Sequence, residues 1–254
     1  MCLIALLLAL AACGGNAEPT PSTETTATTQ TTETTPAGTT SLRVYFLLNG
    51  KVQPVAREVP KTRAVARAAL EQLLAGPNTT ERELGLTTGF DTGARLVAID
   101  INNGLASVAL DGTYTRAGLA QLVYTLTQFP TVKAVRLPPE EVRYTRADFE
   151  EYTPRILVES PLPFETVENP LRATGTANTF EATFQYEVIE PEGRIVEKNF
   201  AMATSGSGFR GTFDFRTLPY EISRPGLGAL VVFEISAKDG SRIHLVEIPV
   251  QMAK

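Results

Sequence analysis

Two apolar stretches decide the fold of the first half of this chain: AALEQLLAGP at residues 68–77 and LAQLVYTLTQFP at residues 119–130. In the first stretch the leucines recur three and four residues apart, which is the spacing of one buried helical face, and Gly76-Pro77 is a typical helix stop. The second stretch has the same periodicity and ends at a proline. The sequence therefore predicts one helix that begins near Thr62 and is ended by Gly76-Pro77, and another over about residues 115–129.

Segments rich in β-branched and aromatic residues surround the two helices. They lie at residues 42–48, 52–59, 94–101, 105–110 and 132–137. Asn49-Gly50 and Asn102-Asn103-Gly104 join two pairs of these segments as hairpin turns. Strands that alternate with helices predict an α/β sandwich, in which two helices cover one side of a mixed sheet.

This first half resembles the GerMN domain of sporulation and spore-germination proteins. The resemblance rests on the two helical stretches, on GLTT at residues 85–88 and on VKAV at residues 132–135, and it extends over about residues 42–150. One difference is visible, because PPEE at residues 138–141 stands where the family has a short glycine-containing hairpin. We therefore expect this edge of the sheet to differ from the family.

The second half predicts strands only. Seven β-rich segments follow one another at residues 155–159, 171–177, 179–189, 194–204, 209–215, 229–237 and 242–250. In the third segment, apolar residues alternate with polar ones from Phe180 to Val188, which predicts one buried and one solvated face. Seven strands in about 100 residues predict an immunoglobulin-like sandwich.

Several motifs of this half resemble the immunoglobulin-like domain of bacterial spore germination. They are SP at 160–161, NPL at 169–171, ANTFEA at 177–182 and FEISAKDG at 233–240. That domain often follows a GerMN domain directly, and the resemblance implies an extracytoplasmic protein with no enzyme activity, cofactor or metal. We therefore predict an α+β chain with a GerMN domain at residues 42–153 and an immunoglobulin-like domain at residues 154–254.

The first twelve residues, MCLIALLLALAA, are too few for a membrane-spanning helix, which needs about 20, and are typical of a signal peptide. LAAC at residues 10–13 resembles the lipobox of bacterial lipoproteins. The resemblance implies cleavage before Cys13 and diacylation of its thiol, and two acyl chains give stable anchoring. We expect lipid anchoring at Cys13 on the extracytoplasmic face of the cell membrane, with a plain secretory signal as the alternative. Since no Lys or Arg precedes the apolar run, we expect translation to begin upstream of Met1.

Residues 13–41 then form a low-complexity segment rich in threonine that includes Pro19, Pro21 and Pro36. Its apolar content is too low to offset the entropy of ordering the chain, so the sequence predicts a disordered linker. An inert spacer is the simplest interpretation, and wall binding or O-glycosylation is the alternative.

The composition excludes several classes of function. The 254 residues carry 23 Lys+Arg and 28 Asp+Glu, a net charge of −5, and no basic run, so we expect no nucleic-acid partner. Two Cys and one His are too few for most zinc, haem or iron–sulfur sites. We predict no catalytic residue, no cofactor and no metal site.

Three motifs have both a chemical and a structural interpretation, and the structural one is preferred for each. His244 lies in a predicted strand beside Val246, which favours a packed or edge-strand histidine over a catalytic base. GSGFRG at residues 206–211 matches a nucleotide-binding pattern but continues as a strand rather than a helix. Residues 100–104 begin like a calcium loop, but Asp111 stands where that loop requires Glu, so a hairpin turn is expected.

Acidic residues gather around the segment between the two domains, at Glu140-Glu141 and at residues 148–151. We predict a solvated connection here. Paired carboxylates could also serve a glycosidase, so the alternative function is a peptidoglycan hydrolase that uses Asp111, Glu140 or Glu141.

The preferred function is a lipid-anchored, non-catalytic envelope protein that binds other proteins or peptidoglycan, in sporulation, germination or envelope assembly. Exposed strand edges would allow strand addition by a partner or pairing between copies of the chain. A solute-binding lipoprotein is a third hypothesis, ranked low because such proteins usually need two larger α/β lobes around a cleft.

Overall fold

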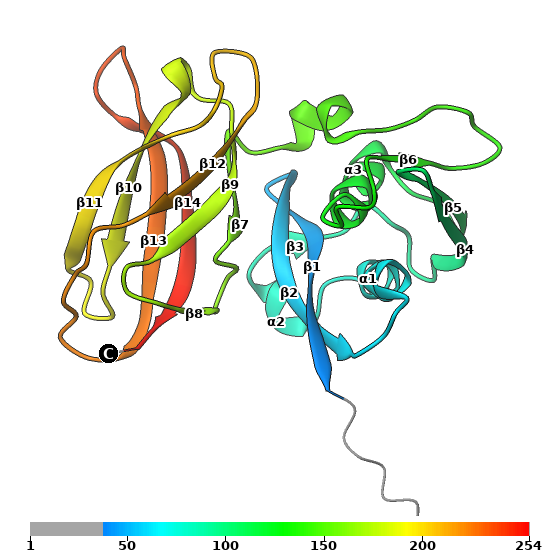
Figure 1. Cartoon of the computed structure of the whole chain (residues 1–254), viewed down its shortest axis with the longest axis horizontal. Helices are drawn as coiled ribbons and strands as arrows, with labels where there is room; N and C mark the ends of the chain where they lie inside the picture. Colours follow the sequence, from blue (N-terminus) through cyan, green and yellow to red (C-terminus); the bar gives the residue numbers. More distant parts are fainter. Residues whose placement is uncertain (1–37, 254) are drawn as a thin grey trace, which may run out of the picture. The chain divides into compact units, whose positions relative to one another are not determined.

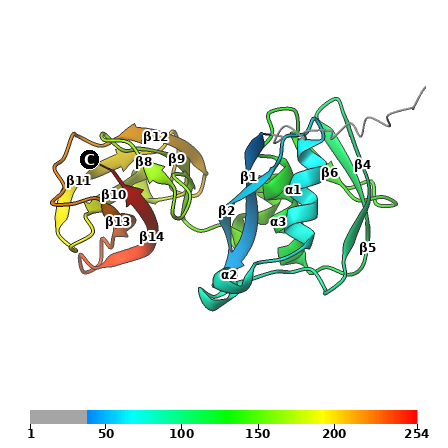
Figure 2. The same ribbon diagram turned by 90° about the horizontal axis from the view of Figure 1, so that it is seen from below.

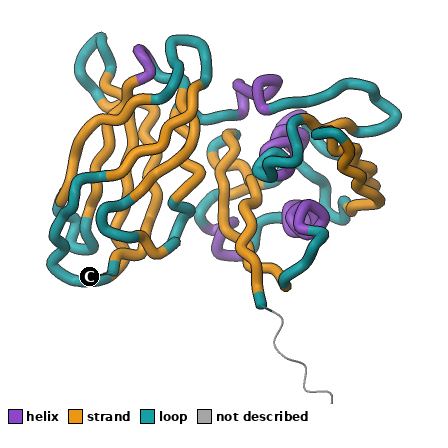
Figure 3. Tube along the Cα trace, viewed as in Figure 1, coloured by secondary structure: helices purple, strands orange, loops and turns teal. Residues whose placement is uncertain are grey.

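The structure is a computed structural model that describes residues 38–253. These residues belong to one compact unit, Ala37–Lys254 (Figure 1). The predicted signal peptide, Cys13 and the linker up to residue 37 lie outside the described residues. Within the described part, no helix has the length and apolar character needed to cross a membrane. The α+β class is confirmed: strands run through both halves, and the longer helices belong to the first (Figure 3).

The first half contains two separate three-stranded sheets, with strand orders β2-β1-β3 and β4-β5-β6. Their bounds are β1 Thr39–Leu48, β2 Lys51–Pro60, β3 Leu86–Thr87, β4 Arg95–Asn102, β5 Leu105–Asp111 and β6 Ala134–Arg136. The first sheet is antiparallel, and in the second β5 and β6 are parallel. Both predicted hairpin turns are confirmed, because Asn49-Gly50 and Asn103-Gly104 have the positive φ values that a two-residue hairpin loop requires.

Two helices, α1 (Val65–Leu74) and α3 (Arg116–Leu126), lie between these sheets (Figure 2). All of α3 from Gly118 to Leu126 is buried. A helix that is buried all round needs packing partners on more than one side. The expectation of one mixed sheet with both helices on one side is therefore wrong, because two separate sheets cover the helices from two sides.

A row of polar side chains joins α3 to the edge of β1. Gln121, Thr125 and, just beyond the helix, Gln128 are four and three residues apart and share one face. The Tyr45 N–H donates to Thr125 Oγ1 (3.2 Å), and Gln121 Nε2 donates to the Tyr45 carbonyl (2.9 Å). Gln128 pairs in the same way with both backbone groups of Arg43. These side chains take the place of a neighbouring strand, which explains why Gln121 and Thr125 are fully buried without being apolar.

The second half is a sandwich of two sheets, with strand orders β11-β10-β13-β14-β8 and β12-β9-β7. The bounds are β7 Ile156–Ser160, β8 Thr166–Val167, β9 Arg172–Ala177, β10 Thr183–Ile189, β11 Ile195–Met202, β12 Gly211–Arg216, β13 Gly226–Ile235 and β14 Arg242–Met252. The two sheets enclose a core in which Phe184 contacts Phe213 with ring centroids 4.9 Å apart. The glycine-rich run at residues 206–211 connects β11 to β12, as predicted.

The alternation predicted for the third segment holds only in part. Phe184, Tyr186 and Val188 are buried as expected. Phe180 is 67% exposed, because the chain turns through a short 3₁₀ segment, Phe180–Ala182, before β10 begins. On the opposite face Glu187 is buried rather than solvated, since Arg242 makes two hydrogen bonds to its carboxylate at 2.7 and 2.8 Å.

The domain boundaries are less sharp than the sequence indicates. β1 begins at Thr39, so the last three residues of the expected linker are part of a strand. At the second boundary, Leu157 of β7 packs in the core of the first half, whereas Ile156 and Val158 pack in the core of the second. Alternate residues of one strand thus belong to different cores, and β7 ties the two halves together.

Candidate functional site

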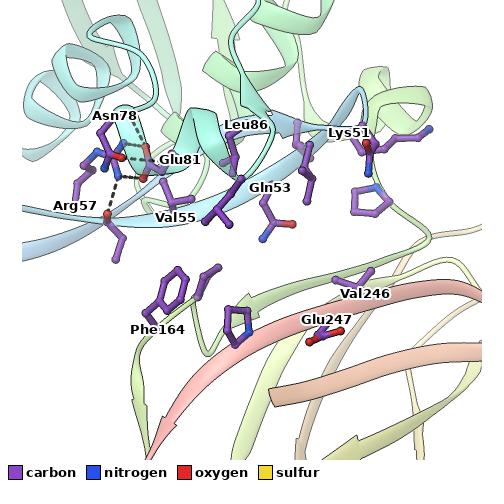
Figure 4. Close-up of a pocket in the computed structure, with 18 of the residues that line it drawn as sticks. Lys51, Gln53, Val55, Arg57, Asn78, Glu81, Leu86, Phe164, Val246 and Glu247 are labelled. Carbon is purple, nitrogen blue, oxygen red and sulfur yellow. Dashed lines mark hydrogen bonds and ion pairs between the residues drawn. The ribbon is translucent and has the colours of Figure 1, made fainter. Parts of the chain in front are cut away.

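A cavity of about 630 Å³, the junction pocket, is formed by residues from both halves of the compact unit. The first half contributes Val55 from β2 and Leu86 from β3, and the second contributes Phe164 and, from β14, Leu245. Figure 4 shows Val55 and Leu86 on one wall and Phe164 on the other. Its volume and largely apolar lining are typical of ligand sites.

A short helix that the sequence interpretation missed, α2 (Thr79–Glu83), closes one end of the junction pocket. Asn78 and Glu81 form a capping box in which each side chain accepts the backbone N–H of the other residue. Arg57 of β2 makes two hydrogen bonds to Glu81 at 2.5 and 2.6 Å. Burial opposes ionisation of Glu81, but the hydrogen bonds from Arg57 lower its pKa below the ordinary value. The carboxylate therefore holds α2 against β2.

A second cavity of about 490 Å³, the polar pocket, adjoins the first. Lys51, Pro154, Leu245 and Val246 line both. The remaining lining residues of the polar pocket are mostly ionisable: Glu150, Glu151, Arg155 and His244, with Thr153. The two cavities together form a site that is apolar at one end and charged at the other.

The carboxylates of the polar pocket are already paired. Arg210 makes hydrogen bonds of 2.8 and 3.0 Å to Glu150, and Arg116 contacts Glu151 at 3.1 Å. Burial opposes ionisation of Glu150, yet the hydrogen bonds from Arg210 and from Asn178 lower its pKa. The expectation of a merely solvated acidic connection is wrong here, because these residues form a 3₁₀ segment, Arg146–Tyr152, whose ion pairs bind it to both halves.

The ion pair between Arg210 and Glu150 predicts that the protein becomes less stable to unfolding in acid. Because the folded pKa of Glu150 is lowered, its contribution is complete above the unfolded value of about 4.5 and is lost as the pH falls through the folded pKa. Urea denaturation of wild type and of Glu150→Gln between pH 3 and pH 7 tests this. We expect the wild type to be more stable at pH 7 and the difference to vanish towards pH 3; a difference that is constant over this range would contradict the assignment.

A network around Glu159 of β7 holds the two halves together. Its carboxylate accepts hydrogen bonds from the Tyr45 hydroxyl and from Arg146 (2.9 Å), and Arg43 donates to its backbone carbonyl (3.2 Å). The Arg146 guanidinium also lies 4.6 Å from the centroid of the Tyr124 ring. Burial and the neighbouring Glu159 raise the pKa of Tyr45, so its hydroxyl stays protonated and donates. No local motif around residue 159 indicated this network.

His244 does not have the partners of a catalytic base. It lies on β14 with a positive φ of 53°, its side chain is 44% exposed, and its Nε2 is 3.8 Å from Glu234 Oε2. Among the hydrogen bonds of residues 38–253, none joins His244 to a hydroxyl. The position agrees with the predicted edge-strand histidine rather than a packed one.

The carboxylates of the hydrolase alternative are not brought together at a cavity. Asp111 pairs with Arg95, and Glu141 contacts Arg136 at 2.8 Å. Glu140 accepts a hydrogen bond from a tyrosine hydroxyl at 3.2 Å. None of the three lines the junction pocket or the polar pocket. Within the described residues, no group of three or more His, Cys, Asp or Glu is placed to hold a metal ion.

The fold defines a two-domain α+β protein, with a helix-containing domain followed by an immunoglobulin-like sandwich. Residues 43–140 match the family described as "Sporulation and spore germination", and residues 155–241 match the "Immunoglobulin-like domain of bacterial spore germination". The chain thus contains a sporulation and spore-germination domain of the GerMN type, followed by the immunoglobulin-like domain of bacterial spore germination. The resemblances of the two domains, to GerMN and to the immunoglobulin-like domain, are confirmed.

Two solved structures are similar to this chain. One is described as tandem GerMN domains of the sporulation protein GerM from Bacillus subtilis; it is 17% identical, with a TM-score of 0.38, over 72% of this chain and 62% of that one. The other, a putative lipoprotein from Clostridium perfringens, is 16% identical, with a TM-score of 0.26, over 47% of this chain and 83% of that one. This chain spans less than two thirds of the GerM structure, and at these scores neither structure carries an argument about function. No curated protein matches the chain.

Proposed function

We propose that this protein is a lipid-anchored, non-catalytic component of the cell envelope that binds a partner protein or peptidoglycan during sporulation, germination or envelope assembly. The matched domains are structural domains of sporulation and germination, and they are not known enzymes. The observation that carries the proposal is the junction pocket with its adjoining polar pocket, formed where the two domains meet.

The state of two carboxylates at the pockets, Glu81 and Glu150, supports binding rather than catalysis. A general acid or base must exchange a proton with a substrate, so it needs a free lone pair or proton within reach. Glu81 and Glu150, the carboxylates most restrained by neighbours at the two pockets, are each held by an arginine and have lowered pKa values. These groups stabilise the walls of the site and are not poised to transfer protons.

The lipid anchor has its own test. In cells supplied with [³H]palmitate, the wild-type protein is expected to be labelled, because the lipobox resemblance places a diacylated thiol at Cys13. Cys13→Ala removes that thiol and is expected to abolish the label, whereas Cys2→Ala, which changes a residue of the predicted signal peptide, leaves it. Equal labelling of the wild type and of Cys13→Ala would contradict the anchor.

The distinction between binding and hydrolysis is tested with purified peptidoglycan. The protein is expected to leave no cleared band in a zymogram and to be retained on peptidoglycan or on a partner protein captured by crosslinking in whole cells. A cleared band that disappears in Asp111→Asn, Glu140→Gln or Glu141→Gln would favour the hydrolase instead. Failure to recover either a partner or peptidoglycan would refute the binding role.

A further inference from the structure

The edge of β14 beside the junction pocket has an open stretch. At its C-terminal end this edge is covered: Gln251 N–H donates to the Glu165 carbonyl (2.8 Å), and Phe164 N–H donates to the Pro249 carbonyl (2.7 Å). Backbone groups of alternate residues in a strand point to the same side. The N–H and C=O of Glu247, two residues before Pro249, therefore face this edge, and in the described part of the chain no hydrogen bond involves them there.

This open stretch lies in the wall of the junction pocket. Four residues of β14 line that pocket: Leu245, Val246, Glu247 and Pro249. Phe164, at the end of the segment that covers the rest of the β14 edge, also lines the pocket. Figure 4 shows β14 at Val246 and Glu247 across the pocket from the wall that holds Val55. A chain that continued the line of β8 along β14 would therefore run through the pocket, with its side chains against apolar walls.

β2, the strand across the junction pocket, has a proline at its free edge. Both backbone groups of Tyr45 point towards α3, so the residue paired with it, Pro54, directs its backbone to the free edge of β2. Proline has no N–H and cannot donate to an added strand. At this position β14 offers both a donor and an acceptor at Glu247, whereas β2 offers only an acceptor at Pro54.

The polar pocket adds a preference for negative charge. Arg116 and Arg210 pair with the two carboxylates there. Lys51 and Arg155 donate instead to backbone carbonyls, at 2.6 and 3.2 Å, and have no carboxylate partner among the ion pairs of the described residues. Lys51 and Arg155 thus have no carboxylate in direct contact next to the open end of the apolar cavity, although the charge of Arg155 helps to lower the pKa of Glu150. Carboxylates are the ligands that such groups bind best in a peptide.

We propose that the protein binds an extended peptide segment of a partner protein by strand addition to β14 at Glu247, with apolar side chains in the junction pocket and a carboxylate in the polar pocket. This inference deepens the proposed function, because it names the chemistry of the partner at that same site. It does not depend on the lipid anchor.

The test uses the full chain carrying Cys13→Ser, which is not acylated, and a displayed library of random octapeptides with free C-terminal carboxylates. Selected peptides are expected to have apolar residues at every second position and to end in, or contain, an acidic group. Replacing the C-terminal carboxylate by an amide, or Arg155→Gln, is expected to weaken binding about tenfold. No enrichment in the selection would overturn the proposal.

Glu247→Pro tests the strand addition itself. It removes the N–H that faces the open edge and leaves the ladder with β13 in place, and we expect at least a tenfold loss of peptide affinity. Glu247→Gln keeps that N–H and is the matched control, with less than a twofold change expected. Urea denaturation shows whether Glu247→Pro is folded; if it is not, hydrogen exchange of the Glu247 amide replaces it, with slower exchange expected when the selected peptide binds.

Two results count against the proposal while leaving the proposed function intact. In one, the selected peptides bind to Glu247→Pro and to Arg155→Gln as tightly as they bind to the chain without these substitutions, which would place the peptides elsewhere on the protein. In the other, vesicles of phosphatidylglycerol displace the peptides, which would make an anionic lipid the occupant. If peptidoglycan or a crosslinked partner is still retained in either case, only the strand-addition site is refuted.

Discussion

Replacement of Gln121 by leucine is expected to lower the free energy of unfolding by about 2–4 kcal/mol, since it leaves one buried and one partly buried backbone group without partners. The Gln121 amide accepts a hydrogen bond from the Gly89 N–H (2.7 Å) and donates one to the Tyr45 carbonyl (2.9 Å). Leucine has a similar size but can do neither. Its greater hydrophobicity offsets part of the loss, which is why we expect a few kcal/mol rather than complete unfolding.

The measurement is the urea midpoint, with the slope of the transition as a check that the unfolded state is unchanged. Gln72→Leu on α1 is the matched control, because Gln72 is partly exposed and makes no side-chain hydrogen bond among the described residues. We expect the control to change stability by less than about 0.5 kcal/mol. Equal effects of the two substitutions would show that the polar row on α3 does not hold β1.

Replacement of Glu159 by leucine is expected to cost about 2–3 kcal/mol and to loosen the contact between the two domains. Loss of one partner of a buried pair typically costs about 3–5 kcal/mol. We expect less here, because the side chains of Arg146 and Glu159 are still 25% and 13% exposed. The substitution leaves the Arg146 guanidinium and the Tyr45 hydroxyl without their acceptor.

A double substitution separates this network from simple packing. Glu159→Leu together with Arg146→Met replaces the pair by apolar groups, and we expect it to recover most of the lost stability. Asp214→Asn is the control, since it breaks the exposed pair between Arg172 and Asp214 and should leave stability nearly unchanged. If the double variant were as unstable as the sum of the single ones, the two side chains would not be coupled.

Much of the fold could be predicted because the relevant signals are local. The leucine spacing from residue 70 to residue 74 and the Gly76-Pro77 stop placed α1, and Asn-Gly pairs placed the hairpins. The capping box at Asn78 and Glu81 was also readable as Asn-x-x-Glu, but the helix that it begins is only five residues long and has no apolar period.

The contacts that decide the sheet arrangement could not be read in this way. Gln121 meets Tyr45 across 76 residues, and Glu159 meets it across 114. Nothing near Gln121 distinguishes it from a glutamine on a solvated face. The split into two sheets follows from α3 being buried all round, and the periodicity of its leucines shows only the most apolar of its faces.

The candidate site was hidden for the same reason. The junction pocket combines residues from β2, from the adjacent α2 and β3, and from β14, which lie in three separate parts of the sequence. The acidic residues 148–151 indicated the segment that lines the polar pocket. Their structural role depends on ion pairs with Arg116 and Arg210, which no local sequence pattern links to them.

The central claim is that the protein acts by contact at the junction pocket. The most direct measurement is photocrosslinking in living cells with p-benzoylphenylalanine at position 245 and, as a control, at position 218. Leu245 is 50% exposed and lines the pocket, whereas Leu218 is 60% exposed and does not. We predict a discrete adduct with a partner polypeptide at position 245 and none at position 218. No adduct at position 245, or the same adducts at both positions, would contradict the account.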